Sequence, residues 1–297
     1  TIIEEAHFMR KVVVDGSNTS GFQRTALVAT GGKIDYKDGT IELDQICLEE
    51  DSCRHGENKD EYLLDRLGIP LLEITTKPQL KSPEQVQNAA RALGRLLRAC
   101  KVKRGLGTIR QDVNVSIDDG ERVELKGFQD LSTMAKVVKN EMERQKKLKI
   151  LKGCKVSEIK NVTEYISKDN GIALACKLEG WNNHLGTKDS PKDHIRMGQE
   201  LSDYAKKAGV KGLMHSDELP AYGISSEETN KINGELRCND KDAFVLIFGN
   251  QRMVQDAMNR VINRASIDGV PKEVRRVTPE GNTRFLRPMP GASRMYP

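Results

Sequence analysis

Residues 108–126, TIRQDVNVSIDDGERVELK, carry the pattern that decides the fold class of this chain. Apolar and polar residues alternate on both sides of the central Asp-Asp-Gly, which is typical of two half-buried antiparallel strands joined by a turn. Putting the apolar residues on one face pairs Ile117 with Val123 and Val115 with Leu125. This register leaves a three-residue loop, 119–121, with Gly120 available for a left-handed position.

The polar face of this predicted hairpin follows from the same register. It places Asn114 opposite Lys126 and Ser116 opposite Glu124, with Asp112 further along the same surface. The hairpin therefore presents two carboxylates, an amide and an ammonium group on one side of a sheet.

Helices are expected on both sides of the hairpin. The sequence Ser82-Pro83-Glu84-Gln85 is typical of a helix start, with Ser as the cap and Pro at the first helical position. The apolar residues that follow at helical spacing are Val86, Ala89, Leu93, Leu97 and Cys100, and the basic face carries Arg91, Arg95 and Arg98.

A second helix is expected from about Ser132 to Leu148. One line along it carries Met134, Val137, Glu141, Gln145 and Leu148. Its last turns are basic, with Arg144, Lys146, Lys147 and Lys149, which suits a helix C-terminus.

The rest of the chain suggests an α+β protein in two parts. Strands are expected at 24–30 and 40–48, and residues 155–269 look like a separate small α+β unit. Within that unit we expect strands at 172–178 and 243–248, helices at 198–207 and 252–264, and a helix opened by Ser225 and Glu228. The basic segment 270–297 is expected to return as extended chain. The predicted division is a mixed or antiparallel sheet domain over 1–154 and 270–297, interrupted by the unit over 155–269.

Composition excludes several classes of protein. No apolar run approaches the roughly 18 residues of a membrane-spanning helix and no leader is visible, which predicts a cytoplasmic protein with no membrane partner. Six scattered cysteines without a CxxC pair indicate reduced thiols. The chain starts at Thr1 and stops in a Pro-rich stretch, so we expect it to be a piece of a longer protein.

Charge is segregated along the chain although the net value is only +5. Residues 40–73 hold ten acidic and three basic side chains, whereas residues 81–111 hold eight basic side chains and one acid. Such neighbouring segments favour different partners, a metal ion for the acids and phosphates for the bases. Two solvated faces are the simpler alternative.

The acids suggest a magnesium and nucleotide site. The hairpin carboxylates near Glu49, Glu50 and Glu73 suit a hard cation, and Lys126 and Arg110 would neutralise phosphate oxygens. Glu73 stands out because it interrupts the apolar stretch 69–74, where a carboxylate is costly unless it is bound or paired. Alternating polar residues on a half-buried sheet are also commonly just solvated.

Other sites lack support. There is neither a GxxxxGK[ST] loop nor a GxGxxG after a strand, and the five histidines have no zinc spacing. With only 13 aromatic residues, a base-stacking platform for single strands is not expected. The basic helix and residues 101–104 can instead meet phosphate backbones through charge.

Several segments resemble the GatB/GatE family of tRNA-dependent amidotransferase subunits. They are DGSNTSGFQRT at 15–25, LEEDS at 48–52, DRLGIPLLEI at 65–74, KRGLGTIRQDVNVS at 103–116 and VELKG at 123–127. The unit at 155–269, with HSDELPAYG at 215–223, is similar to the insertion domain of bacterial aspartyl-tRNA synthetases, which favours the archaeal GatE branch.

The resemblance implies a ligase that uses ATP and Mg²⁺ to phosphorylate the side chain of Glu on tRNA(Gln). Ammonia from an asparaginase-like D subunit then gives Gln-tRNA(Gln), in a heterotetramer of two D and two E subunits. Carried onto this chain, the metal ligands are Glu49, Glu50, Asp112 and Glu124, the nucleotide contacts are Arg110, Asn114 and Lys126, and the catalytic set is Glu50, Glu73, Arg110 and Lys126.

The departures from the family pattern are at the two ends. The family's first strand, with Glu-x-His metal ligands, would precede Thr1, and its tRNA-gripping domains would follow Pro297. The resemblance therefore predicts that this chain by itself lacks amidotransferase activity. The alternatives are a non-catalytic tRNA-binding module, a GatB-type subunit and, on the insertion alone, an aspartyl-tRNA synthetase fragment.

Overall fold

The computed structural model describes residues 1–12, 21–58, 60–105, 107–128, 130–151, 155–167, 171–187, 196–289 and 295–296. Within these ranges the chain forms five α-helices and several sheets, so the predicted α+β class is confirmed. It divides into two compact units: unit 1 is Thr1–Gln111, Gln129–Ala135 and Arg287–Pro297, and unit 2 is Asp112–Phe128 and Lys136–Leu286. The predicted domain boundaries at 154 and 270 remain a prediction.

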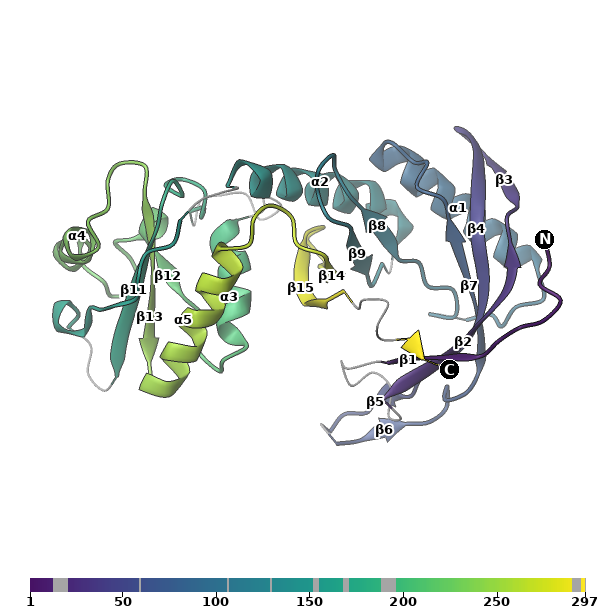
Figure 1. Ribbon diagram of the computed structural model, residues 1–297, viewed down its shortest axis with the longest axis horizontal. Helices are drawn as coiled ribbons and strands as arrows, with labels where there is room; N and C mark the ends of the chain where they lie inside the picture. Colours follow the sequence, from purple (N-terminus) through teal and green to yellow (C-terminus); the bar gives the residue numbers. More distant parts are fainter. Residues whose placement is uncertain are drawn as a thin grey trace. The chain divides into compact units, whose positions relative to one another are not determined.

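Unit 1 is built on a six-stranded sheet with the order β16-β1-β2-β4-β3 and β7 paired to β4 (Figure 1). Its strands are β1 (Met9–Val12), β2 (Phe22–Thr30), β3 (Lys33–Tyr36), β4 (Gly39–Glu50), β7 (Pro70–Thr76) and β16 (Met295–Tyr296). Strands β5 (Arg54–His55) and β6 (Tyr62–Leu63) form a separate short hairpin. Strands β2 and β4 confirm the two expected near the N-terminus. The Gly/Ser/Asn-rich stretch 16–23 is typical of a loop; its residues 16–20 lie outside the described residues, and Phe22 and Gln23 belong to β2.

Helix α1 (Pro83–Ala99) begins where the sequence predicted it. The Ser82 hydroxyl accepts a hydrogen bond from the backbone N–H of Gln85 at 3.2 Å, which satisfies one of the free donors of the first turn. Its buried face consists of the small residues Ala89, Ala90, Ala92 and Gly94. Cys100, expected on that face, is exposed, whereas the three arginines are exposed as predicted.

The hairpin of β8 (Val113–Val115) and β9 (Val123–Lys126) is confirmed, but its predicted register is wrong by two residues. The observed pairs are Val113 with Leu125, Asn114 with Glu124 and Val115 with Val123. A shift by an even number of residues leaves every side chain on its predicted face. The same shift moves Glu124 opposite Asn114 instead of Ser116.

A long-range hydrogen bond explains the longer loop of this hairpin. The backbone N–H of Ile117 donates to the side-chain oxygen of Gln145 at 3.1 Å, so Ile117 leaves the strand ladder. The turn then places Asp119, rather than the expected Gly120, in the left-handed region with φ +58°. Gln145 lies on the neighbouring helix, which is a contact that the local sequence does not reveal.

The C-terminal segment returns as extended chain, as predicted. Strand β14 (Glu273–Val277) pairs with β9 in parallel, and β15 (Thr283–Pro288) follows it in a four-stranded sheet of order β15-β14-β9-β8. Strand β16 in turn pairs with β1 in the sheet of unit 1.

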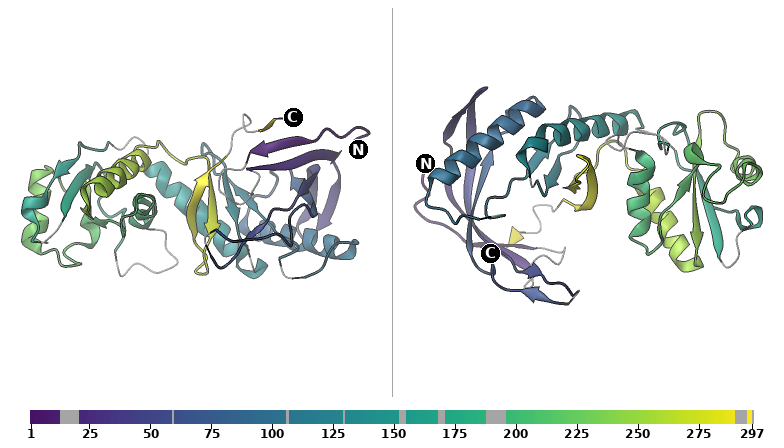
Figure 2. Two further views of the ribbon diagram at one scale, coloured as in Figure 1. Left: turned by 90° about the horizontal axis from the view of Figure 1, so that it is seen from below. Right: turned by 180° about the vertical axis from the view of Figure 1, so that it is seen from behind.

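A second part of unit 2 is a sheet covered on both faces. Its strands are β10 (Lys160–Asn161), β11 (Ile172–Leu178), β12 (Met214–His215) and β13 (Ala243–Gly249), and its helices are α3 (Met197–Lys206), α4 (Ser226–Glu235) and α5 (Gln251–Ala265). Helices α3 and α5 lie side by side against one face, and α4 lies on the other (Figures 1 and 2). Residues 173–176 are all buried, as expected for a strand with no solvent face.

The short 3₁₀ helices are η1 (Leu131–Thr133), η2 (Thr163–Tyr165) and η3 (Ser216–Glu218). Helix α2 (Met134–Ile150) follows η1 directly, two residues later than expected, and buries the complete line from Met134 to Leu148 that the sequence predicted. Arg144, assigned with three lysines to the basic end of this helix, differs from the lysines in that its side chain is completely buried.

Arg144 lies in a buried cluster of six charged side chains, hereafter the buried ion cluster. Its members are Glu141, Arg144, Glu200, Arg264, Glu273 and Arg275, each at most 4% exposed. Glu200 accepts hydrogen bonds from all three guanidinium groups, at 2.7 Å from Arg144 and 2.8 Å from each of the other two. The cluster therefore connects α2, α3, α5 and β14 within unit 2.

The cap of helix α4 gives a testable contribution to stability. Ser225 Oγ accepts from the Glu228 N–H at 3.1 Å, and the Glu228 carboxylate accepts from the Ser225 N–H at 2.7 Å, which confirms the predicted helix start. We expect Ser225→Ala to lower the free energy of unfolding by about 1 kcal/mol in urea denaturation. Ser226→Ala, at an exposed position that makes no cap, is the matched control and should change it little; equal effects would contradict the capping role.

Two further expectations concern membranes and thiols. Among the described parts of the chain, no helix combines the length and apolar character needed to cross a membrane. Cys47, Cys53, Cys100, Cys176 and Cys238 are free thiols, as predicted, and Cys154 lies outside the described residues.

Candidate active site

The polar edge of the β8–β9 hairpin brings four of the predicted site residues together in unit 2. Lys126 Nζ lies 2.7 Å from Asp112 Oδ2 and 2.7 Å from Glu124 Oε1. Asn114 pairs with Glu124 across the two strands. Two carboxylates from neighbouring strands therefore converge on one positive charge.

The ammonium group of Lys126 is held in its charged form. Burial acts to lower the pKa of Lys126, but attraction by Asp112 and Glu124 outweighs it, so the pKa is raised above the ordinary value for lysine. The side chain of Lys126 is 35% exposed and that of Asp112 is 41% exposed, so the cluster is open to a ligand from solvent.

In unit 1 the predicted acids Glu49 and Glu50 lie at the end of β4, next to Asp51, and each of these three is paired with a base. The pairs are Glu49 with Lys11 at 2.9 Å, Glu50 with Arg24 at 3.1 Å and Asp51 with Arg110 at 3.1 Å. Consecutive residues of a strand point to opposite faces of the sheet, so Glu49 and Glu50 diverge. Glu49 faces a partner on β1, whereas Glu50 faces one on β2.

Glu73 lies at an exposed position of β7, next to the exposed Leu72, so the expected cost of burying this carboxylate does not arise. That Glu73 is bound or paired stays a prediction. In the sheet it lies opposite Cys47 of β4, and Glu49 is two residues further along on the same side of the strand. Burial and these two carboxylates together raise the pKa of the Cys47 thiol, which places Glu49 and Glu73 in one electrostatic environment.

Asp51 is a site candidate that the sequence interpretation missed. It is only 8% exposed, and its carboxylate accepts hydrogen bonds from Arg110 at 3.1 Å and from the Ser52 N–H at 3.0 Å. Half of the Arg110 side chain remains exposed, so it can donate to a ligand while Asp51 holds one edge. The available signal was its position as the third consecutive acid of LEEDS.

The carboxylate pair fits part of a magnesium site. No group of three or more His, Cys, Asp and Glu side chains that could hold a metal ion occurs in the portion of the chain that the structure describes. Mg²⁺ in phosphate-transfer sites, however, is commonly held by one or two carboxylates together with substrate phosphates. Asp112 and Glu124 already converge on one cation, the ammonium of Lys126, so their chemistry suits such a partial ligand set.

Comparison with known proteins decides the family. The sequence model of the GatB/GatE catalytic domain matches residues 1–297. The chain belongs to the GatB/GatE family. This membership covers both units, from the acidic end of β4 to the hairpin cluster and the sheet of β10, β11, β13 and β12.

Curated members of the GatB/GatE family are similar to the chain over nearly all of its length. The E subunit of glutamyl-tRNA(Gln) amidotransferase from Thermococcus sibiricus is 46% identical over 99% of this chain and 51% of the relative. The E subunit from Methanothermobacter thermautotrophicus is 44% identical over 99% of this chain and 50% of the relative. The E subunit from Pyrococcus abyssi is 46% identical over 99% of this chain and 50% of the relative. The chain thus spans about half the length of the curated relatives it matches.

Proposed function

We propose that the chain is the part of a tRNA-dependent amidotransferase subunit that carries the ATP-dependent step. In this step the side-chain carboxylate of Glu on tRNA(Gln) takes the γ-phosphoryl group of ATP, and ammonia then displaces phosphate to give Gln-tRNA(Gln). The observation that carries the proposal is the family match over all 297 residues. The names of the relatives support the GatE branch over a GatB-type subunit.

The site residues have distinct proposed roles. Asp112 and Glu124 hold Mg²⁺, and Glu49 and Glu50 are further candidate ligands. When bound, Mg²⁺ supplies positive charge that stabilises the negative charge developing on the transferred phosphoryl group. Asn114 is a nucleotide contact.

The cations of the chain act on the phosphates directly. Lys126, whose raised pKa keeps it protonated at neutral pH, donates to a phosphate oxygen. Arg110 donates from the guanidinium edge that Asp51 does not occupy. Glu73 completes the proposed catalytic set with Glu50, and its exposure leaves it accessible to substrate.

The proposed partners extend beyond this chain. They are Glu-tRNA(Gln) and an asparaginase-like D subunit that supplies ammonia, in a cytoplasmic heterotetramer of two D and two E subunits. The chain spans about half the length of the curated relatives it matches, so these partners are proposed for the complete protein.

The proposal is tested with the full-length protein and its partner. We expect conversion of Glu-tRNA(Gln) to Gln-tRNA(Gln) that requires both ATP and Mg²⁺, measured by chromatography of the released amino acid. Residues 1–297 alone are expected not to complete this conversion. Turnover of the full-length complex without ATP would contradict the proposed phosphorylation step.

A second candidate function, a non-catalytic tRNA-binding module, is favoured by the exposed arginines of α1. Arg91, Arg95 and Arg98 form one basic stripe, followed by the basic residues of 101–104. Replacing all three arginines by Gln should weaken tRNA binding and reduce the slope of log K against log salt by about 2 to 3.

Salt titrations of tRNA binding to the full-length protein check this prediction. The matched control is Lys146→Gln, which removes an exposed lysine paired with Glu143 in unit 2. If the slope of log K against log salt is unchanged in the triple variant, α1 does not bind tRNA through these arginines. If tRNA binding does not change with ATP or Mg²⁺, and Glu-tRNA(Gln) is not converted, the tRNA-binding module is favoured over the enzyme.

A further inference from the structure

Helix α2 holds the edge of the hairpin that carries the proposed magnesium site. The side-chain amide of Gln145 bridges two backbone groups there: its Oε1 accepts from the Ile117 N–H at 3.1 Å, and its Nε2 donates to the Val115 carbonyl oxygen at 3.2 Å. The Gln145 side chain is completely buried. One amide therefore pairs with an acceptor and a donor two residues apart along the chain, as a neighbouring strand would.

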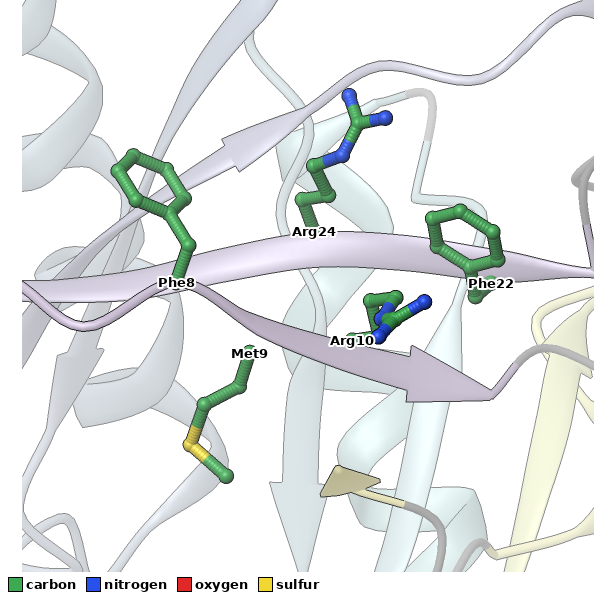
Figure 3. A pocket seen from close by; sticks show the side chains of 5 residues that line it. All are labelled: Phe8, Met9, Arg10, Phe22 and Arg24. Atoms are coloured by element: carbon green, nitrogen blue, oxygen red, sulfur yellow. The ribbon is translucent and has the colours of Figure 1, made fainter. Parts of the chain in front are cut away.

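Strand β8 needs such a contact because it is short and lies at a sheet edge. Strand β9 lies between β14 and β8, but among the described residues β8 has a strand on one side only. Strand β1 of unit 1 differs, because β2 pairs with it on one side and β16 on the other. Side chains of β1, of β2 and of the residue before β1 lie together around a shallow pocket of about 210 Å³, lined by Phe8, Met9, Arg10, Phe22 and Arg24 (Figure 3). Two strands thus flank β1, whereas the free side of β8 is held by the Gln145 amide.

Glu141 fixes which way the Gln145 amide points. The Glu141 carboxylate accepts from Gln145 Nε2 at 3.0 Å, so the amide nitrogen faces this acid and the amide oxygen faces the Ile117 N–H. Glu141 belongs to the buried ion cluster, and it also accepts hydrogen bonds from Arg144 and from Thr283 Oγ1, each at 2.8 Å. The packed interior of unit 2 therefore sets the position of Gln145, independently of the hairpin.

The same helix holds the loop of the hairpin. Lys149, about one turn after Gln145, donates from Nζ to the Asp118 carbonyl oxygen at 2.9 Å. Residues four apart lie on one face of a helix, so Gln145 and Lys149 form one line along the hairpin. The Gly120 N–H donates to the Ile117 carbonyl oxygen at 3.0 Å, which closes the turn. Helix α2 therefore contacts the hairpin from the end of β8 into the loop.

Two registers of this hairpin place apolar side chains on the same face. In the observed register Val115 lies opposite Val123, and the connection runs over residues 116–122. A slip of β8 by two residues would place Ile117 opposite Val123 and shorten the connection to 118–122, within the range of about two to five residues that is typical of hairpins. The hydrophobic pattern is equal in the two registers and the turn length favours the slipped one. A contact outside the hairpin must therefore hold the observed register.

The register decides whether the site residues meet. In the observed register Asn114 lies opposite Glu124, and Asp112 and Glu124 each lie 2.7 Å from Lys126 Nζ. A strand rises about 3.4 Å per residue, so a slip by two residues would move β8 about 7 Å along β9. Glu124 would then face Ser116, and Asp112 would leave Lys126. The two carboxylates could no longer converge on one cation.

We propose that Gln145 is a positioning residue of the magnesium site: its amide holds the register of β8 against β9 and so keeps Asp112 and Glu124 on one cation. Gln145 acts through the backbone of β8, and Glu141 orients its amide. This inference rests on the proposed function for the role of the two carboxylates, whereas the control of the register by Gln145 does not depend on it.

Pairs of introduced cysteines report the register in the full-length protein. Val115→Cys/Val123→Cys matches the observed register, whereas Ile117→Cys/Val123→Cys can form a disulfide only after the slip, because diagonal residues of neighbouring strands are about 7–8 Å apart. Oxidation with diamide, followed by mass spectrometry of the peptides, measures the rate of each cross-link. With Gln145 in place, we expect the first pair to form at least about tenfold faster than the second. Gln145→Met, which keeps the side-chain length without the amide, should reduce this ratio by about tenfold through the loss of two hydrogen bonds.

The magnesium dependence separates a positioning role from a purely structural one. Gln145→Met should raise the Mg²⁺ concentration that gives half the maximal rate of ATP-dependent phosphate release by about 10- to 100-fold. Adding the oxidised Val115→Cys/Val123→Cys pair should return this concentration toward the wild-type value, because the disulfide then holds the register in place of the amide. The matched control is Glu143→Met, at an exposed position of α2, which should leave both measurements unchanged.

Three outcomes would overturn the proposal. One is equal cross-linking of the two cysteine pairs with Gln145 present, a comparison that remains valid even if Gln145→Met does not fold. Another is an unchanged cross-linking ratio in Gln145→Met whose circular dichroism is that of the wild type. The third is a raised Mg²⁺ requirement that the oxidised pair does not correct, which would make Gln145 a residue of general stability.

Turnover of the wild-type complex separates this proposal from the proposed function. If the wild type converts Glu-tRNA(Gln) but the cross-linking ratio does not depend on Gln145, the inference about Gln145 fails and the proposed function stands. If the wild type shows no conversion that requires ATP and Mg²⁺, the proposed function fails, and a ratio that falls in Gln145→Met still supports the control of the register by Gln145.

Discussion

Replacing Glu124 by alanine in the full-length protein is expected to slow the ATP-dependent phosphorylation of Glu-tRNA(Gln) by about 100-fold or more. The carboxylate of Glu124 lies 2.7 Å from the ammonium group of Lys126, which Asp112 also contacts. Removing Glu124 therefore halves the negative charge that the two carboxylates supply to the proposed metal site. A bound metal ion contributes several kcal/mol to the transition state, and each 1.4 kcal/mol is tenfold in rate. Asp112→Ala is expected to have an effect of the same order.

Single-turnover release of phosphate from ATP, with Glu-tRNA(Gln) present, measures this step. Raising the Mg²⁺ concentration should recover part of the rate in Glu124→Ala, because the weakened site fills at higher concentration. The matched control is Glu121→Ala, an exposed acid in the loop of the same hairpin, which should leave the rate near that of the wild type. A wild-type rate in Glu124→Ala would contradict the assignment of Glu124 as a Mg²⁺ ligand.

The buried ion cluster of unit 2 supports the second large prediction. We expect Glu200→Gln to lower the free energy of unfolding by about 3–5 kcal/mol, because it leaves three buried guanidinium groups with too little negative charge. Amide and carboxylate have nearly the same shape, so the loss reports charge and hydrogen bonding rather than a cavity. Urea denaturation followed by circular dichroism measures it.

An exposed glutamate provides the comparison for this variant. Glu143 pairs with Lys146 at 2.8 Å on the same helix as Arg144, but its side chain is 54% exposed. Glu143→Gln should change the free energy of unfolding by no more than about 0.5 kcal/mol, as for other exposed pairs. A similarly small effect of Glu200→Gln would show that the buried ion cluster contributes no net stability.

The pH dependence of unfolding follows from the same residue. Burial would raise the pKa of Glu200, but Arg144, Arg275 and Arg264 outweigh it and hold the pKa well below the ordinary value. The folded state therefore binds this proton more weakly than the unfolded state does. Its stabilising contribution is complete above about pH 4.3 and is lost as the pH falls further, and Glu200→Gln should remove this part of the pH profile.

Local signals in the sequence were reliable for the helix starts and the strand faces. Ser82 and Ser225 cap the helices they were expected to cap, because capping depends on residues within one turn. The hairpin kept its predicted polar face despite a wrong register, because side-chain direction depends only on the parity of the pairing.

Signals that depend on distant residues failed. Glu73 looked costly within an apolar stretch, yet its position on β7 is exposed, which the stretch itself does not reveal. Arg144 was assigned to the basic end of a helix, yet it is buried and binds Glu200 and Glu273, more than 50 residues away in sequence. Asp51 was overlooked because its partner Arg110 lies 59 residues away.

The sequence by itself determined the family, the α+β class, the helix starts and the polar side of the hairpin. These depend on residue type and short spacing, which the order of residues records directly. Only the tertiary structure decided which charges are paired: Asp112 and Glu124 with Lys126, Asp51 with Arg110, and the six residues of the buried ion cluster. Coulomb attraction and desolvation depend on distance in space, and distance in space is set by strand pairing and packing between segments far apart in the chain.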